Sequence, residues 1–176
     1  IRNLTAAGAE LIQERATLVD AHTVQLASGR KVSAKYILIA TGATPFVPRH
    51  LPGHELAITS NEAFHLERLP RRMVIVGGGY ITVEFAGIFN KLGVETILLY
   101  RGEKILRGFD EDLRNHLTAE MEKKGIDIRC NADVEKIERS GDGVRVTLND
   151  GERIGAGQIM YCTGRIPNIV DLGLEN

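Results

Sequence analysis

Features that would point to several function classes are scarce in this chain of 176 residues. The formal net charge is -1, so no basic field favours nucleic acid or an anionic membrane surface. No apolar run approaches the ~20 residues that a membrane-spanning helix requires. We therefore expect neither a nucleic-acid partner nor a membrane partner.

Cysteine is also scarce, and the two that are present, Cys130 and Cys162, are far apart and in no metal-like or C-x-x-C spacing. Each lies in an apolar run, where a free cysteine usually behaves as a small buried hydrophobe. We predict no metal site and no redox pair, and the usage fits a reducing, cytoplasmic compartment. The first residue is Ile1 and no signal peptide is visible, which is compatible with a chain that begins inside a larger protein.

The composition is that of a globular domain, with 43% hydrophobic and 26% charged residues. The length suits one domain, or one domain with pieces of a neighbour. Residues 45–53 contain three prolines and indicate a connection between domains. The first forty residues favour β structure, with strand-like runs at 10–16 and 23–27. Residues 36–40 form a continuous apolar run that predicts a strand buried on both faces, followed by the small residues Thr41-Gly42.

The central stretch, residues 73–107, contains the most informative motif of the chain, a strand, a glycine turn, a helix and a second strand. An apolar run at 73–76 predicts a buried strand that leads into Gly77-Gly78-Gly79, and residues 96–100 predict a second strand. The segment between them predicts a helix that ends at Gly93. Its apolar stripe is expected to lie on the sheet and consists of Ile81, Phe85, Ile88 and Leu92.

Three residues in this stretch occupy the positions of a G-x-G-x-x-G dinucleotide fingerprint, namely Gly77, Gly79 and Thr82. Gly77 permits a tight turn, and Gly79 lets a phosphate approach without a Cβ in the way. The N-terminus of the following helix can accept the negative charge of a pyrophosphate. The third position usually holds Gly or Ala, so Thr82 is a departure. The strand–turn–helix–strand context predicts a dinucleotide-binding unit.

The end of the second strand indicates which dinucleotide is bound. NAD sites usually place Asp or Glu there, whereas NADP sites use Arg for the additional phosphate. Here the strand ends at Tyr100-Arg101, with Lys104 and Arg107 close behind and Glu103 among them. A guanidinium matches phosphate through its fork of donors. We therefore predict NADP(H); the alternative is an exposed basic loop without a ligand.

The rest of the chain predicts two further helices and a change of period. Ser60 is expected to cap a short helix that runs to Leu66. Asp110 is expected to cap a longer helix that ends at Gly125 and turns Leu113, Leu117 and Met121 inward. A third strand follows at 126–130. Alternating runs then predict antiparallel strands at 134–139 and 144–148 with a third after the turn at 149–151, before a last apolar strand at 158–162.

These motifs together resemble the central part of the flavin-dependent pyridine-nucleotide disulfide oxidoreductases, and the resemblance covers almost the whole chain. Residues 37–42 are similar to the A-T-G segment beside FAD, and residues 77–87 to the NADPH fingerprint. Residues 161–168 resemble the segment that returns the chain to the flavin domain. The loop at 100–110 most resembles that of the glutathione reductases, with the trypanothione reductases close behind.

The resemblance implies roles for individual residues. Arg101 and Arg107 would bind the 2′-phosphate. Tyr80 would cover the flavin and swing aside for nicotinamide, and Glu84 would pair with a lysine near the flavin. Without the resemblance, Tyr80 reads as a half-exposed helix residue and Glu84 as a surface carboxylate. The other cofactor-binding positions that it implies are Thr41, Gly42, Gly77, Gly78, Gly79, Ile81, Gly164 and Arg165.

The chain also departs from the family pattern. Thr82 replaces the usual Ala, and Cys162 replaces the usual Ala or Ile before Thr-Gly. It contains no C-x-x-x-x-C redox disulfide, no first G-x-G-x-x-G for the ADP half of FAD, and no C-terminal interface domain with a His-Glu pair. We therefore expect a fragment that binds NADP(H) weakly and is inactive alone.

These observations predict an α/β fold: a Rossmann-like parallel sheet, a three-stranded antiparallel β-meander, and flanking strands from an FAD domain. Residues 1–44 would belong to the FAD-binding domain, residues 45–167 to the NADPH-binding domain, and residues 168–176 would return to the FAD domain. The resemblance implies a homodimeric parent enzyme that passes electrons from NADPH through FAD and a disulfide to glutathione disulfide. The alternatives are a trypanothione or mercuric reductase, or a non-catalytic nucleotide-binding module.

Overall fold

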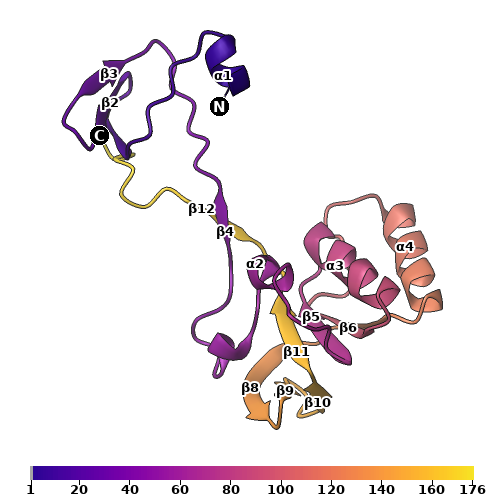
Figure 1. The fold of residues 1–176 in the computed structure, drawn as a ribbon. Coiled ribbons are helices and arrows are strands. Elements are labelled where there is room, and N and C mark those ends of the chain that lie inside the picture. The colour runs from indigo at the N-terminus through magenta and orange to yellow at the C-terminus, as the bar shows by residue number, and fades with distance from the viewer. Residues whose placement is uncertain (1) are drawn as a thin grey trace. The chain divides into compact units, whose positions relative to one another are not determined.

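The computed structural model describes residues 2–176, which form two compact units. The smaller unit contains residues 2–43 and 167–176, and the larger unit contains residues 44–166. Figure 1 shows the elements of each. Among the described residues, no helix has the length and hydropathy that a bilayer crossing would need. The larger unit carries the glycine turn, residues 77–79, and the basic loop, residues 101–110.

The larger unit is built on a four-stranded parallel sheet with the order β11-β5-β6-β7. Two helices, α3 and α4, connect β5 to β6 and β6 to β7, as parallel strands require a crossover. The strands and helices are β5 (Arg72–Val76), α3 (Tyr80–Lys91), β6 (Glu95–Tyr100), α4 (Glu111–Lys123), β7 (Asp127–Cys130) and β11 (Gln158–Tyr161).

A three-stranded antiparallel meander takes the place of a crossover helix between β7 and β11. It consists of β8 (Val134–Ser140), β9 (Gly143–Leu148) and β10 (Arg153–Ala156). The parallel sheet and the meander confirm the predicted α/β fold. In the sequence, the meander is indicated by the apolar residues, whose spacing changes from helical to alternating at residue 134.

The parallel sheet is covered on both faces, which makes three layers. Because side chains alternate along a strand, Met73 and Ile75 of β5 face α3 and α4, whereas Val74 and Val76 face the meander. All four are at most 5% exposed. Figure 1 shows the helices and the meander against different parts of this sheet. The continuous apolar run in the sequence thus corresponds to a strand buried on both faces.

The buried face of α3 differs from the predicted stripe. It consists of Thr82, Phe85, Ala86 and Phe89. Ile88 and Leu92 are 47% and 57% exposed, so the prediction for these two residues is wrong. The small side chain of Ala86 allows the helix to approach the sheet, and a count of large apolar residues misses such a face. Gly93, with φ of +84°, follows the helix as predicted.

Helix α4 begins as predicted. The carboxylate of Asp110 accepts hydrogen bonds from the backbone N–H groups of Asp112, at 3.0 Å, and Leu113, at 3.2 Å. Met121 is buried, and Leu117 is half-buried, in the core cluster between the sheet and the helices α3 and α4, which we call the helix-side core. Leu113 is 49% exposed, contrary to the prediction, because the helix joins this core only further along, through Leu117 and Met121.

The short helix α2 (Ser60–Ala63) starts and ends differently from the prediction. Its N-cap is Thr59, whose side chain accepts from the backbone of Asn61 while Glu62 bonds back to the backbone of Thr59. This reciprocal capping box is stronger than the single cap expected from Ser60. The helix stops at Ala63 and does not reach Leu66. A single 3-10 turn, η1 (His54–Leu56), precedes it.

The smaller unit contains a three-stranded antiparallel sheet and one short helix. The expectation of β structure at the start of the chain was wrong, because a helix lies there. The strand expected at 10–16 was also wrong, since a strand forms only from Ala16 onward. Its elements are α1 (Arg2–Ala6), β1 (Ala16–Asp20), β2 (Thr23–Leu26) and β3 (Lys31–Ser33). Two further strands, β4 (Ala43–Pro45) and β12 (Arg165–Pro167), pair where the chain passes from one unit to the other.

The strand predicted at residues 36–40 is also wrong. These residues form no strand, and Tyr36 and Leu38 are 81% and 90% exposed. A strand buried on both faces needs neighbours on both edges and layers on both faces, and none of the described residues supplies them. Leu26 is the one buried side chain among the described residues of this unit.

Candidate functional site

The glycine turn begins where β5 ends. Gly77 has φ of +143°, a conformation that favours glycine. A Cβ at this position would lie 2.5 Å from Oγ1 of Thr82 and 2.6 Å from the carbonyl oxygen of Cys162, so no larger residue fits. The Gly77 N–H donates to the carbonyl of Leu99 on β6 at 2.9 Å, which ties the turn to the neighbouring strand.

Gly79 is the N-cap of α3, and contacts within the chain do not explain why this residue is glycine. Its backbone is extended, and a Cβ there would meet nothing within 4 Å, so the packing of this chain does not require glycine. No side chain caps the helix, so the first-turn N–H groups of Tyr80 and Ile81 have no capping acceptor among the described residues. An open, uncapped helix N-terminus of this kind accommodates a phosphate group.

The ring of Tyr100, the last residue of β6, lies between two glycines. A Cβ on Gly78 would collide with the ring, and one on Gly102 would lie 2.7–2.9 Å from it. The carbonyl of Gly78 accepts a hydrogen bond from the N–H of Leu106 at 2.5 Å. The glycine turn and the basic loop are therefore in direct contact.

The basic loop between β6 and α4 is anchored from within. Ile105 and Leu106 are 0% and 4% exposed and belong to the helix-side core. Helix α4 adds a second anchor, because the guanidinium of Arg114 donates to two carbonyl oxygens of the loop. Lys104 forms an ion pair with Glu111. The charge of Lys104 is therefore committed to the protein.

Arg101, the first residue of this loop, and Arg107, six residues later, are exposed. Neither side chain has a hydrogen-bond or ion-pair partner among residues 2–176. Because β5 and β6 are parallel neighbours, the loop after β6 and the turn after β5 lie at the same edge of the sheet. Two uncommitted guanidinium groups thus accompany an uncapped helix N-terminus, a combination suited to a ligand with several phosphates.

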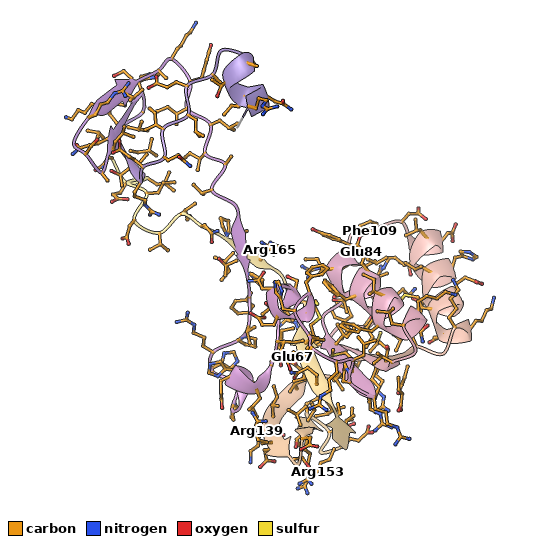
Figure 2. The ribbon with its side chains drawn as sticks, viewed as in Figure 1. Glu67, Glu84, Phe109, Arg139, Arg153 and Arg165 are labelled. Carbon is orange, nitrogen blue, oxygen red and sulfur yellow. The ribbon has the colours of Figure 1, made fainter. Side chains whose placement is uncertain are left out.

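Tyr80 and Glu84 lie one helical turn apart on α3, so they share a face of the helix. Tyr80 is 57% exposed, and Glu84 is exposed with no partner among the described residues. Figure 2 shows Glu84 on α3. Ile81, between them in sequence, is partly buried against the helix-side core, so its side chain contacts the protein.

The second Thr-Gly segment lies in the larger unit, directly after β11. The hydroxyl of Thr163 donates to the carbonyl of Phe46 at 3.0 Å, and the N–H of Phe46 donates to the carbonyl of Gly164 at 3.0 Å. Gly164 has φ of +133°. Arg165 follows on β12, where Figure 2 labels it, and is engaged in an interaction within the chain.

The first Thr-Gly segment makes the same pair of bonds in the smaller unit. The hydroxyl of Thr41 donates to the carbonyl of Asn168 at 2.7 Å, and the N–H of Asn168 donates to the carbonyl of Gly42 at 3.0 Å. Gly42 has φ of +75°. The repeated Thr-Gly pattern in the sequence therefore corresponds to a repeated local structure.

Comparison with known proteins agrees with this geometry. Residues 1–176 match the family described as pyridine nucleotide-disulphide oxidoreductase. The chain is 48% identical to a glutathione reductase from Nostoc sp. (strain PCC 7120 / SAG 25.82 / UTEX 2576), over 98% of this chain and 38% of that protein. It is 45% identical to a trypanothione reductase from Trypanosoma congolense, over 82% of this chain and 30% of that protein. The chain belongs to this family.

A solved structure supports the membership at the level of the fold. The HOCl-induced flavoprotein disulfide reductase RclA from Escherichia coli superposes with a TM-score of 0.85 at 28% identity, over 99% of this chain and 40% of that chain. The pyridine nucleotide-disulphide oxidoreductase resemblance read from the motifs is therefore confirmed. This chain spans less than half the length of the relatives described above.

The two cysteines of this family member are free thiols. Cys162 is buried, and its burial raises the pKa of the thiol to about 12. Burial also raises the pKa of the half-buried Cys130. Because the thiolate is the reactive form, both cysteines are poor nucleophiles at neutral pH. Among the described residues, no cluster of His, Cys, Asp and Glu could hold a metal ion.

Sequence reasoning missed the residues that support the loop. Glu111 and Arg114 make an i,i+3 ion pair at 2.8 Å, a spacing visible in the sequence after the Asp110 cap. That pattern predicts only a helix-surface pair. The contacts of Arg114 with loop carbonyls depend on how α4 packs beside the loop, and no local pattern carries that information.

Proposed function

We propose that the larger unit binds NADP(H) at the glycine turn and that the protein is a flavin-dependent disulfide reductase, most consistent with a glutathione-disulfide reductase. The observation that carries the proposal is the pair Arg101 and Arg107. Both guanidinium groups are uncommitted, and they border a loop that is hydrogen-bonded to the glycine turn. An adenosine ribose with a 2′-phosphate would satisfy them, and a free 2′-hydroxyl would not.

The residues of this chain bind and orient in that proposal. The uncapped N-terminus of α3 would hold the pyrophosphate, with Gly79 leaving space for it. Tyr80, which is largely exposed, is free to move aside for the nicotinamide ring. The unpaired carboxylate of Glu84 would meet a cation near the flavin. When bound, NADPH and FAD supply the hydride chemistry themselves.

The two Thr-Gly segments are proposed to lie on the flavin side. In this proposal Thr41, Gly42, Gly164 and Arg165 contribute to the FAD site. Residues 1–44 and 168–176 would belong to the FAD-binding domain and residues 45–167 to the NADPH-binding domain. The full-length protein would act on a small-molecule disulfide, as the relatives named glutathione reductase suggest. We also propose that it is a cytoplasmic homodimer.

A second candidate within the family is a trypanothione reductase, which the 45% identity to two such enzymes favours over more remote activities. A mercuric reductase or a non-catalytic nucleotide-binding module are further alternatives. Turnover of the full-length protein with glutathione disulfide, trypanothione disulfide or Hg(II) distinguishes the three enzymes from one another. Flavin absorbance together with turnover distinguishes any of them from the non-catalytic module.

The selectivity for NADPH can be tested on the chain itself. We expect Arg101→Ala and Arg107→Ala each to weaken NADPH binding by about tenfold or more, because each removes charge-assisted hydrogen bonds to the 2′-phosphate. NADH binding should change by less than about twofold, since NADH lacks that phosphate. Titration calorimetry with both nucleotides provides the measurement.

Arg139 offers a matched control for this experiment, because it is an exposed arginine on the meander, where Figure 2 labels it. Arg139→Ala removes the same charge from the molecule at a different place and should leave both affinities unchanged. Equal losses for NADPH and NADH in the Arg101 and Arg107 variants would contradict the proposed phosphate site.

A further inference from the structure

Arg114, in the second turn of α4, makes more contacts with the loop than any sequence pattern indicates. Its side chain is 17% exposed. Nε donates to the carbonyl of Ile105 and Nη2 donates to the carbonyl of Lys104, each at 2.8 Å. Nη1 bonds to the carboxylate of Glu111 at 2.8 Å. Each of the three nitrogens of this guanidinium therefore donates one hydrogen bond within the protein.

The carbonyls that Arg114 holds lie in a constrained part of the loop. Leu106 has φ of +57°, a left-handed conformation that is unfavourable for a residue with a Cβ atom. Its N–H donates to the carbonyl of Gly78 in the glycine turn. Such a conformation persists only where neighbouring contacts over-determine it. The fork of Arg114 on the two preceding carbonyls is one of those contacts.

Glu111 completes the arrangement from the first turn of α4. Its carboxylate bonds to both Lys104 and Arg114, and the hydrogen bond from Lys104 is the largest cause of its lowered pKa. Glu111 is therefore ionised at neutral pH and neutralises part of the charge of these two cations. Arg101 and Arg107 are left as the cations of the loop that have no partner among the described residues.

We propose that Arg114 is a positioning residue that determines the preference for NADPH over NADH without touching the nucleotide. By fixing the backbone of Lys104 and Ile105, it holds Arg101 and Arg107 in the geometry that the 2′-phosphate requires. A preorganised loop pays less ordering cost on binding than a mobile one. Only NADPH depends on that geometry, so the effect is specific to NADPH. This inference rests on the proposed NADP(H) function.

Two substitutions separate geometry from charge. Arg114→Lys keeps the positive charge but cannot donate to both carbonyls through a planar fork. Arg114→Gln removes the charge as well. We expect both to weaken NADPH binding by about tenfold, equivalent to ~1.4 kcal/mol, and to change NADH binding by less than about twofold. Titration of each purified 176-residue variant with both nucleotides gives the ratio.

A second readout follows the loop directly. In both variants, amide hydrogen exchange at residues 104–107 should become faster, including the N–H of Leu106 that bonds to Gly78. Lys123→Gln is the matched control, because Lys123 is a cation on the same helix whose one ion-pair partner among residues 2–176 is Glu120, at 2.7 Å. It should leave both the nucleotide preference and the exchange of the loop unchanged.

The outcomes are distinct. Wild-type selectivity in Arg114→Lys would overturn the proposal in favour of a simple charge effect, and equal losses for both nucleotides would show a general loss of structure. If the Arg114 variants do not fold, Glu111→Gln, which leaves Arg114 in place but loosens its anchor, must lower NADPH affinity alone, and an unchanged ratio overturns the proposal. A wild-type chain without any preference for NADPH would instead refute the proposed function.

Discussion

At the scale of single residues, Thr82 shows how this family member accommodates a bulky residue at the third fingerprint position. Thr82 is 0% exposed, and its hydroxyl donates to the carbonyl of Cys162 at 3.4 Å. The space for its side chain is provided by the missing Cβ of Gly77, which would otherwise lie 2.5 Å from the hydroxyl oxygen. Thr82 therefore packs inward, between the turn and the end of β11, and does not face the proposed nucleotide.

This packing makes Thr82 a stability residue. We expect Thr82→Ala to lower the free energy of unfolding by about 1 kcal/mol, through the lost methyl group and the lost hydrogen bond. NADPH affinity should stay within about twofold, because the substitution does not alter the uncapped end of α3. Urea unfolding and calorimetric titration measure the two quantities, and Thr82→Val separates the hydroxyl from the methyl. A clear gain in NADPH affinity in Thr82→Ala would show that Thr82 weakens the site instead.

At the scale of elements, local pattern predicted the strands of the larger unit and misjudged the faces of its helices. Residues 73–76 and 96–100 were recognised because each is a continuous apolar run between turn signals. The face of α3 was misjudged because it uses Thr82 and Ala86, two residues that a search for large apolar side chains overlooks. Helix faces depend on how closely the helix approaches the sheet, which the sequence does not specify locally.

The start of α4 links an element to the proposed selectivity. Asp110 caps the helix, and the first two turns carry Glu111 and Arg114, which hold the loop. The cap was predictable, since Asp before a helical run is a common N-terminal signal. The contacts of Arg114 were not, because they join a side chain to carbonyls nine and ten residues away in the sequence.

We expect Asp110→Ala to destabilise the chain by about 1 kcal/mol, because two backbone N–H groups lose their acceptor. Chemical denaturation followed by circular dichroism gives the value. Asp112→Ala is the comparison, since Asp112 is an exposed residue of the first turn that accepts no capping bond among the described residues. It should cost only the weaker interaction with the helix dipole, about 0.3 kcal/mol. A loss in the Asp112 variant that equals the loss in the Asp110 variant would argue against a capping role.

At the scale of the whole molecule, the two units differ in how much of their structure the sequence could predict. The larger unit has two buried clusters on the two faces of one sheet. The apolar runs of this sheet therefore find their neighbouring strands and covering layers within the chain. Residues 36–40 carry the same kind of apolar run as β5, yet they form no strand, and all but Ile37 are exposed. The same local pattern therefore gives a strand only where partner strands and covering layers are present.

The arrangement of thiols leads to an expectation for the chain as a whole. Cys162 and Cys130 are free, and burial keeps the thiolate form of each scarce at neutral pH. We expect the purified 176-residue chain to bind NADPH but not to oxidise it when glutathione disulfide is added, because it offers no reactive thiol pair to receive electrons. Nicotinamide absorbance, followed with and without added FAD, measures turnover. Sustained NADPH oxidation that disappears in the Cys130→Ala/Cys162→Ala double variant would show that these thiols are competent and would refute the expectation.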